Sequence, residues 1–545
     1  MRRYLAVAVA VLALLGALAP PVFAQAPAPK VTIEGLVDQT MTYTKNMSIY
    51  DNDLTRDKDK TWNARMRGNL YITGEVGKVK AFTFLKHDVS YGSATGGAYG
   101  VPFHTGPFGL TDGQLQAEVQ GLIDLVELYT EFPLSGEGSL LPFVPVPGLA
   151  RVGFQNFDVD TYKLGALAWG FYPGAHIELD VVPGAKLTAT YAQLEESITG
   201  TRDNPAFNRG DDFAMIFGLE TSPMKGLNVK PVYAYYFADG ITTGFAGPRQ
   251  GRGGVSDSAG FFPVGTNENR HTLGIDATWT SGPWSLAPTF YYQTGSREML
   301  PTVASSKKRL GIGTCGAAGC VEQDISAWLL DVQGGWQSGP LQLEGLFVYS
   351  PGNEAKEDIR AGRTIHFYQP ISTDAVYGVN WGHIVAITYD YKQQLGYDGV
   401  GGQGLCPACG VSYDKYGRLQ FGVRASYNVT PAFKLRGVLT SLWAAEDVDT
   451  LATVGGGGLT PTRTGANSKG KDSYLGTETD AGFEWKFAPN ITFATIYAHL
   501  FAGEGLGNAC GTPTGVAGCN STTPNATARN AKDVDALTTM IRFVF

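Results

Sequence analysis

The chain has 545 residues, of which 71 are glycine and 12% are aromatic, and its formal net charge at pH 7 is −8. The acidic balance argues against a nucleic-acid partner. After residue 24 no apolar run approaches the roughly 18 residues that a membrane-spanning helix needs, and no division into several soluble domains is visible. A helical membrane protein is therefore excluded, and a single very large β protein remains.

The first residues predict export. Arg2 and Arg3 precede an apolar run, residues 5–19, that is too short for a comfortable membrane span. Small or modest side chains before residue 25 place signal-peptidase cleavage after Ala24, so residues 1–24 are interpreted as a signal peptide and residues 25–30 as a short periplasmic segment. Removal of the two arginines takes the net charge to about −10. A transmembrane anchor is the alternative interpretation.

The next feature in chain order is an alternation of apolar and polar residues. It is clearest in residues 62–72, where Trp62, Ala64, Met66, Leu70 and Ile72 alternate with Asn63, Arg65, Arg67, Asn69 and Tyr71. The same pattern returns in residues 328–336 and 418–427. A period of two predicts strands with one apolar and one polar face.

Short and long connections between these strands alternate along the chain. Tight turns rich in Gly, Pro and Asn are expected at Gly74–Lys78, Pro183–Lys186, Ser222–Gly226, Ser281–Pro283, Ser338–Pro340, Asn428–Pro431 and Ala488–Asn490. Long loops are expected at Gly92–Gly121, Asp239–Asn269, Gly295–Gln323, Glu446–Asp472 and Gly503–Asp533. A soluble sandwich or propeller has no reason to sort its connections in this way, whereas a membrane barrel does, with short periplasmic turns and long extracellular loops.

The predicted fold class is therefore all-β, a single closed antiparallel transmembrane β-barrel over residues 25–545. Closure is required because backbone groups in lipid must all be paired. About 18 strands fit, with 16 to 20 defensible, and Ile359–Tyr391 is the least secure region of the count. Aromatic residues near many strand ends suit the interfacial girdles of such barrels, although aromatics favour strands in general.

The end of the chain carries a family likeness. Phe545 follows an alternating strand in which Phe543, Ile541 and Leu537 share a face. This pattern resembles the closing strand of bacterial outer-membrane porins. The resemblance implies that Phe545, Phe543 and Ile541 are the signal read by the barrel-assembly machinery, that the barrel lies in the outer-membrane lipid, that small hydrophilic solutes cross it, and that a homotrimer is an expected assembly.

The six cysteines form three close pairs, all in segments assigned to long loops: Cys315 with Cys320, Cys406 with Cys409, and Cys510 with Cys519. Export predicts disulfides at loop tips. The alternative is metal binding, because Cys406 and Cys409 have C-x-x-C spacing, but no second half of such a site is present. No catalytic, metal-site or nucleotide motif was found, so neither an enzyme nor a cofactor is expected.

Charged residues on the polar faces are expected to line the lumen. The basic set is Arg65, Arg67, Arg418, Arg424, Lys434, Arg436 and Arg542, and the acidic set on the far wall is Asp276, Asp331 and Glu344. We expect either a transverse field that selects solutes or mutual pairing that rigidifies the wall, with Glu34 and Asp38 able to neutralise Arg65 and Arg67. The loop at 92–121 is the predicted constriction.

Three functions follow from these expectations. The first is a channel for small hydrophilic solutes or ions, because barrels of this size hold an aqueous lumen. The second is a sheath or export conduit around a partner, such as a cytochrome or a polymer. The third, a barrel enzyme or adhesin, lacks a catalytic constellation.

Overall fold

The structure is a computed structural model. It describes residues 28–46, 60–91, 123–136, 138–156, 161–195, 212–239, 265–299, 321–354, 357, 364–372, 377–385, 408, 410–448, 453–455, 458–460, 472–506 and 532–545. One 18-stranded antiparallel sheet dominates these residues, which confirms the predicted fold class and strand number. Its strands are β1 (Lys30–Lys45), β2 (Lys60–Val76), β3 (Val79–Tyr91), β4 (Asp124–Ser135), β5 (Gly148–Asn156), β7 (Phe171–Val182), β8 (Ala185–Glu195), β9 (Asp212–Met224), β10 (Leu227–Asp239), β11 (Gly265–Ser281), β12 (Trp284–Met299), β13 (Val321–Ser338), β14 (Leu341–Ser350), β16 (Arg418–Thr430), β17 (Phe433–Val448), β20 (Asp472–Ala488), β21 (Ile491–Ala502) and β22 (Val534–Val544).

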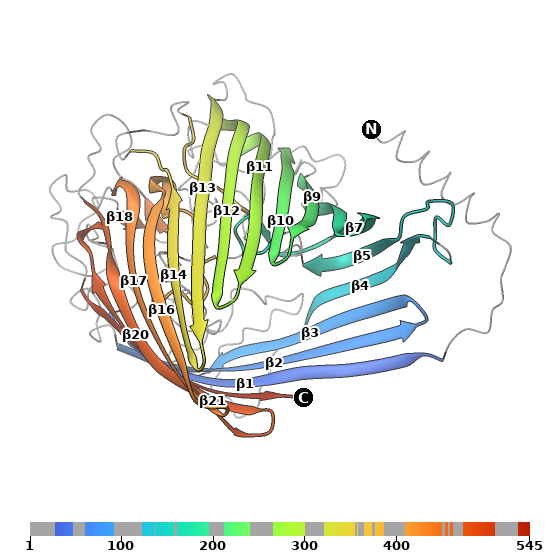
Figure 1. Ribbon diagram of the computed structural model, residues 1–545. Helices are drawn as coiled ribbons and strands as arrows, with labels where there is room; N and C mark the ends of the chain where they lie inside the picture. Colours follow the sequence, from blue (N-terminus) through green and yellow to red (C-terminus); the bar gives the residue numbers. More distant parts are fainter. Residues whose placement is uncertain are drawn as a thin grey trace.

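The sheet closes because its first and last strands pair. β1 and β22 are antiparallel from Leu36 opposite Val544 to Lys45 opposite Asp535, and blue β1 lies beside the red end of the chain in Figure 1. Beyond this ladder, Gly35 and Phe545 exchange both backbone hydrogen bonds, at 2.9 and 3.0 Å. No strand edge is left along this seam, as a barrel in lipid requires.

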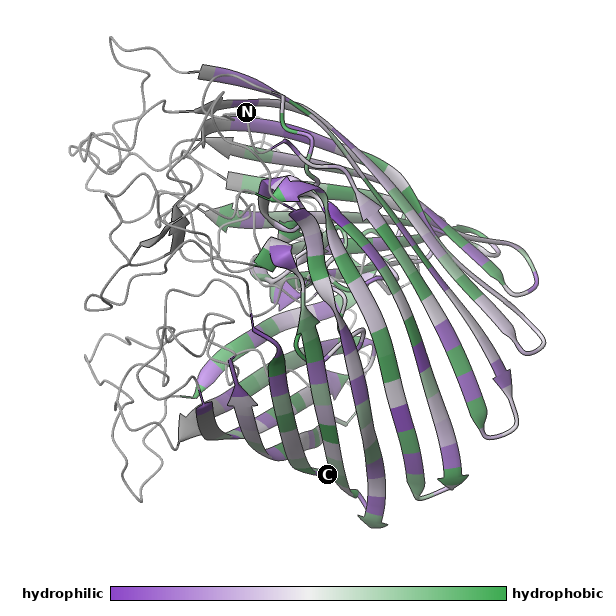
Figure 2. Ribbon diagram, turned by 90° about the vertical axis from the view of Figure 1, so that its left-hand side faces the viewer, coloured by the Kyte–Doolittle hydropathy of each residue, from purple (hydrophilic) through white to green (hydrophobic). Residues whose placement is uncertain are grey.

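All seven predicted tight turns are confirmed, and they gather at one end of the barrel, here called the turn end (Figure 2). Gly184, with φ of 81°, and Asn490, with φ of 61°, supply the left-handed conformations that such short reversals use. An eighth connection, between β4 and β5, is longer and was not predicted as a turn.

The outward face is apolar. Along the strands hydrophobic and hydrophilic residues alternate (Figure 2), and outward side chains such as Val423 (56% exposed) and Leu273 (52%) remain open to the surroundings. Aromatic rings pair on this face towards both strand ends, for example Trp284 with Trp336 (6.4 Å between centroids) near the turns. An exposed apolar band with aromatic borders identifies the surface as lipid-facing.

Four small strands and two short helical turns complete the described elements. The strands are β6 (Ala168–Trp169), β15 (Ile371–Ser372), β18 (Thr453–Gly455) and β19 (Gly458–Thr460), and the 3-10 turns are η5 (Asp414–Tyr416) and η6 (Glu504–Leu506). β6 and β15 pair in parallel, apart from the barrel sheet. No helix in the described ranges is long and apolar enough to cross a membrane.

The region Ile359–Tyr391, where the strand count was least secure, contributes no strand to the barrel wall in its described part. Residues 364–372 and 377–385 instead pack against lumen-facing side chains. The chain therefore keeps 18 wall strands and uses this segment to fill part of its own interior.

Candidate functional site

Segments of two loops pack inside the barrel. The first is residues 161–170, between β5 and β7, and the second comprises residues 364–372, 377–385, 408 and 410–417, between β14 and β16. We call these residues the plug. Two hydrophobic clusters seat the plug, and their wall members come from β7, β8, β9, β10, β12, β13 and β14 in one cluster and from β17, β20, β21 and β22 in the other.

Lys163 anchors the first plug segment. Its ammonium donates to the Asp331 carboxylate (2.7 Å), to the Asp331 carbonyl (2.6 Å) and to the Ala287 carbonyl (2.7 Å). The β11–β12 pairing skips Ala287 and its neighbour Pro288, which has no N–H for the ladder. This break in the ladder lies where the Ala287 carbonyl accepts the ammonium. Burial lowers the pKa of Lys163, and the Asp331 carboxylate opposes that effect.

The two aspartates predicted for the far wall both lie beneath the plug. Asp276 accepts the Tyr162 N–H (2.5 Å) and the Thr289 hydroxyl (2.5 Å), and Asp331 accepts the Tyr377 hydroxyl (2.5 Å) as well as the Lys163 ammonium. Burial raises the pKa of the Tyr162 hydroxyl to about 12. These carboxylates hold plug segments in place.

Gln293 on β12 fixes the second plug segment by imitating a neighbouring strand. Its carbonyl oxygen accepts the Gln369 N–H (3.0 Å), and its amide donates to the Gln369 carbonyl (2.7 Å). Both polar groups of one buried backbone unit are thereby satisfied, as burial requires. Beside them the guanidinium of Arg270 lies over the Tyr236 ring, 4.7 Å from its centroid.

Glu478 on β20 is the third anchor. Its carboxylate accepts three consecutive backbone N–H groups, those of His383 (2.6 Å), Ile384 (2.7 Å) and Val385 (2.7 Å). Hydrogen bonds to an ionised acceptor are about twice as strong as neutral ones. His383 also contacts the Thr538 hydroxyl of β22 through Nε2 (2.7 Å), and burial lowers the pKa of His383 to about 3.

Two arginines of the predicted basic set also touch the plug. The Arg418 guanidinium donates to the carbonyls of Ala408 (2.9 Å) and Gly410 (2.7 Å) and lies over the Tyr377 ring. The Arg424 guanidinium lies 4.4 Å from the centroid of Trp381. Both arginines lie on β16, and Arg424 also pairs with Glu344 of β14 (2.6 Å).

Neither cluster that seats the plug draws a residue from β1 to β5. The polar anchors described above reach β11, β12, β13, β16, β20 and β22, on the same side as those clusters. Within the described residues, the plug is therefore fastened along β7 to β22.

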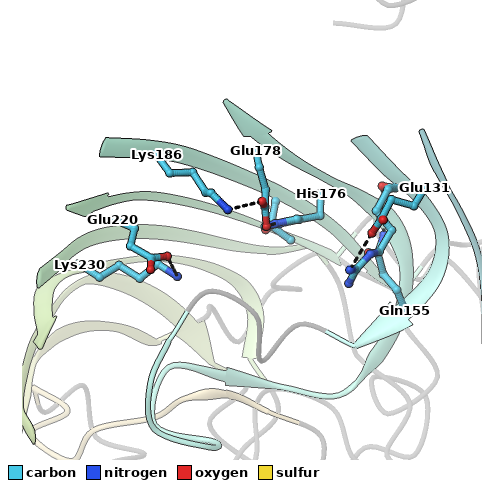
Figure 3. A network of polar contacts seen from close by, with 9 residues as sticks. Glu131, Gln155, His176, Glu178, Lys186, Glu220 and Lys230 are labelled. Carbon is cyan, nitrogen blue, oxygen red and sulfur yellow. Dashed lines mark hydrogen bonds and ion pairs between the residues drawn. The ribbon is translucent and has the colours of Figure 1, made fainter. Parts of the chain in front are cut away.

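Cross-strand ion pairs encircle the lumen towards the turn end, and Figure 3 shows part of them on β4 to β10. The pairs are Lys80 with Glu131 (3.2 Å), Arg151 with Glu131 (3.1 Å), Lys186 with Glu178 (2.6 Å), Lys230 with Glu220 (3.6 Å), Arg424 with Glu344 (2.6 Å), Arg436 with Glu484 (3.4 Å) and Arg542 with Asp38 (2.6 Å). Within β7, His176 also contacts Glu178 (3.3 Å). At these positions the charged side chains pair with one another, as the second of the two expectations for the lumen charges has it.

The register places the predicted lumen residues as follows: Arg65 and Arg67 on β2, Asp276 on β11, Asp331 on β13, Glu344 on β14, Arg418 and Arg424 on β16, Lys434 and Arg436 on β17, and Arg542 on β22. Arg65 and Arg67 are buried, opposite Thr40 and Asp38 of β1. A transverse field remains a prediction. Among the described residues, no group of three His, Cys, Asp or Glu side chains is placed to hold a metal ion.

Several sequence predictions fall outside the described residues. They are the signal peptide at residues 1–24, the predicted constriction at residues 92–121 and all six cysteines. The sequence analysis did not predict the plug, although it named Ile359–Tyr391, which lies between β14 and β16, as the least secure region of the strand count. Its composition resembles strand composition, so no local pattern distinguishes an inward loop from a wall strand.

No protein-family model and no curated protein sequence matches the chain. Solved structures with a similar fold include OccK8 (OprE) of Pseudomonas aeruginosa, which is 12% identical, covers 95% of this chain and 98% of its own, and has a TM-score of 0.47. OpdK of Pseudomonas aeruginosa, solved with vanillate, is 10% identical over 94% of this chain and 98% of its own, with a TM-score of 0.45. OccAB1 of Acinetobacter baumannii is 9% identical over 94% and 96%, with a TM-score of 0.44.

Proposed function

We propose that the chain is a bacterial outer-membrane porin whose water-filled passage admits small hydrophilic solutes. The observation that carries the proposal is the eccentric plug: an 18-stranded barrel is wide enough for an aqueous lumen, and the chain's own loops are fastened along β7 to β22. Narrowing by fixed loops suits selection of small solutes.

A sheath or an export conduit fits this geometry less well. A folded partner such as a cytochrome would need the space that the plug occupies. Displacing the plug would cost free energy, because its hydrogen bonds with Lys163, Gln293 and Glu478 would break. For an enzyme, the described residues offer no matched nucleophile and base, and the lumen carboxylates of Glu178, Glu344, Asp331 and Glu478 are committed to ion pairs or plug anchors.

Single-channel conductance in a planar bilayer tests the proposal. The full-length barrel should give steady current steps in potassium chloride. A variant in which residues 364–385 are replaced by a short Gly-Ser linker should give larger steps, because part of the plug is gone. A matched linker at residues 453–460, which contribute β18 and β19 outside the barrel sheet, serves as the control. A folded but silent barrel would contradict the channel function.

The proposal also covers processing, membrane insertion, assembly and the cysteines. Residues 1–24 are removed on export, the closing strand with Ile541, Phe543 and Phe545 directs insertion by the barrel-assembly machinery, and the barrels associate as trimers. The cysteine pairs form loop disulfides. Native mass spectrometry of the purified protein, with and without reductant, measures the processed N-terminus, the oligomeric state and the number of disulfides together.

A further inference from the structure

A buried carboxylate of the lumen wall lacks a hydrogen-bond partner. Asp480 on β20 is 6% exposed, and neither of its side-chain oxygens accepts a hydrogen bond from any described residue. Its neighbours across the ladder are Val438 of β17 and Ala498 of β21, whose side chains carry no donor. Burial of an ionised carboxylate is costly unless the charge is matched. A group that the described residues do not supply is therefore needed to satisfy Asp480.

A second carboxylate lies beside the first. Glu478 is two residues earlier on β20, so its side chain points to the same face of the sheet, and it is fully buried. The plug N–H groups of residues 383–385 all donate to it, an arrangement that suits a negative charge. The two side chains together make an acidic pair beneath the plug.

The basic residues on this part of the wall lie at a different carboxylate. Lys434 is directly opposite Glu484 in the β17–β20 ladder, and Arg436 donates to Glu484 over 3.4 Å. On the plug side, His383 is neutral because burial lowers its pKa to about 3. Among the described residues, no cation forms an ion pair with Glu478 or Asp480.

We propose that Glu478 and Asp480 bind a calcium ion that helps to fasten the plug to β20. Calcium takes about six to eight oxygen ligands and accepts carboxylates in bidentate form, so one ion satisfies both oxygens of Asp480. A shared proton would satisfy only one of them, because a protonated carboxyl donates a single hydrogen bond. Two carboxylates also balance the charge of a divalent ion.

The plug backbone closes over the acidic pair at Gly382. A Cβ atom on Gly382 would lie only 3.0 Å from Oε2 of Glu478 and 3.3 Å from the Thr440 methyl group, so glycine permits the approach. Thr440 is directly opposite Glu478, and its hydroxyl, which accepts the Gln420 amide (2.8 Å), has a second lone pair for the ion. Because only two ligands are acidic, water completes the shell, and the affinity belongs to the weak extracellular class, about 0.1–1 mM.

Hydrogen–deuterium exchange at the amides of residues 383–385 tests the site. The full-length barrel is refolded in detergent, so that no anionic lipid competes for the metal, treated with EGTA and titrated with calcium chloride at constant ionic strength. Exchange should slow in a saturable manner, by roughly 10 to 100 times at 10 mM calcium, because stabilisation grows with the ratio of ion concentration to dissociation constant. Magnesium should act more weakly, since it demands octahedral geometry and keeps its water.

Two variants make the test specific. Asp480→Asn removes one charged ligand oxygen and should raise the half-saturating calcium concentration by about tenfold or more. Glu484→Gln, on the same face of β20, should leave the calcium response unchanged. The wild-type comparison with and without calcium requires no variant, so misfolding of Asp480→Asn leaves the test intact. Because the readout is backbone exchange, the result does not depend on whether the barrel conducts.

Three outcomes overturn the proposal. The first is exchange in the folded wild-type barrel that calcium does not change. The second is an equal calcium response in wild type and Asp480→Asn, or an equal response to magnesium, which would assign the slowing to divalent ions in general. The third is exchange that ignores calcium but rises from pH 7 to pH 9, after correction for intrinsic rate, only when Asp480 is present; this would assign a shared proton to the acidic pair.

Discussion

Replacing Glu478 by glutamine should loosen the plug without changing the shape of the side chain. In the native barrel one carboxylate oxygen accepts the N–H groups of His383 and Ile384, and the other accepts that of Val385. Glutamine keeps a single acceptor. The first two bonds then weaken from charge-assisted to neutral, and the third N–H faces an amide donor.

The magnitude follows from these three bonds. An orphaned buried donor costs about 1–3 kcal/mol, and each weakened bond loses roughly 1 kcal/mol. Removal of a buried charge returns part of this, so we expect a net loss of about 2–4 kcal/mol in the free energy that holds residues 383–385 in place. Local opening should then become roughly 30 to 1000 times more frequent.

Hydrogen–deuterium exchange of the detergent-solubilised barrel measures this directly at the amides of residues 383–385. Glu484→Gln is the matched control, since Glu484 lies on the same face of β20 but pairs with Arg436 (3.4 Å), its side chain 29% exposed. It should leave those amides unchanged, because exposed ion pairs contribute little. Equal protection in wild type and Glu478→Gln would refute the anchoring role.

Three further predictions concern the other anchors and the seam. Lys163→Met leaves the buried Asp331 carboxylate without its cation, because the Lys163 and Asp331 side chains are only 6% and 2% exposed. The free energy of unfolding, measured by denaturant titration, should fall by about 3–5 kcal/mol. Adding Asp331→Leu in the same chain should restore part of this loss. His383 is neutral in the plug because burial lowers its pKa from 6.5 to about 3, so an expelled plug binds an extra proton between those values and acid should favour expulsion. Exchange of its segment, corrected for intrinsic rate, should rise from pH 7 to pH 4 in wild type but not in His383→Gln; identical curves would contradict this. Arg542→Gln removes the cation that binds Asp38 across the seam (both contacts 2.6 Å). It should lower the free energy of unfolding, measured by denaturant titration, by about 1–3 kcal/mol, whereas an unchanged free energy would show that the backbone ladder alone secures closure.

The sequence by itself determined the barrel. The alternation in residues 62–72 predicts which side chains face lipid, because successive side chains of a strand point to opposite faces. The pairing of β2 with β1 runs without a shift through these residues. Turn residues such as Gly184 and Asn490 indicated the reversals, because few other residue types adopt a positive φ without a cost in free energy. Closure followed from the cost of unpaired backbone in lipid.

Only the tertiary structure decided what fills the lumen. The plug is held by single long-range contacts, such as Lys163 with Asp331 and Val385 with Glu478, which join residues 168 and 93 positions apart. Such contacts leave no period in the sequence. Asp331 was expected on the lumen face, and the residue that it meets there, the buried ammonium of Lys163, depends on a loop that folds back over it.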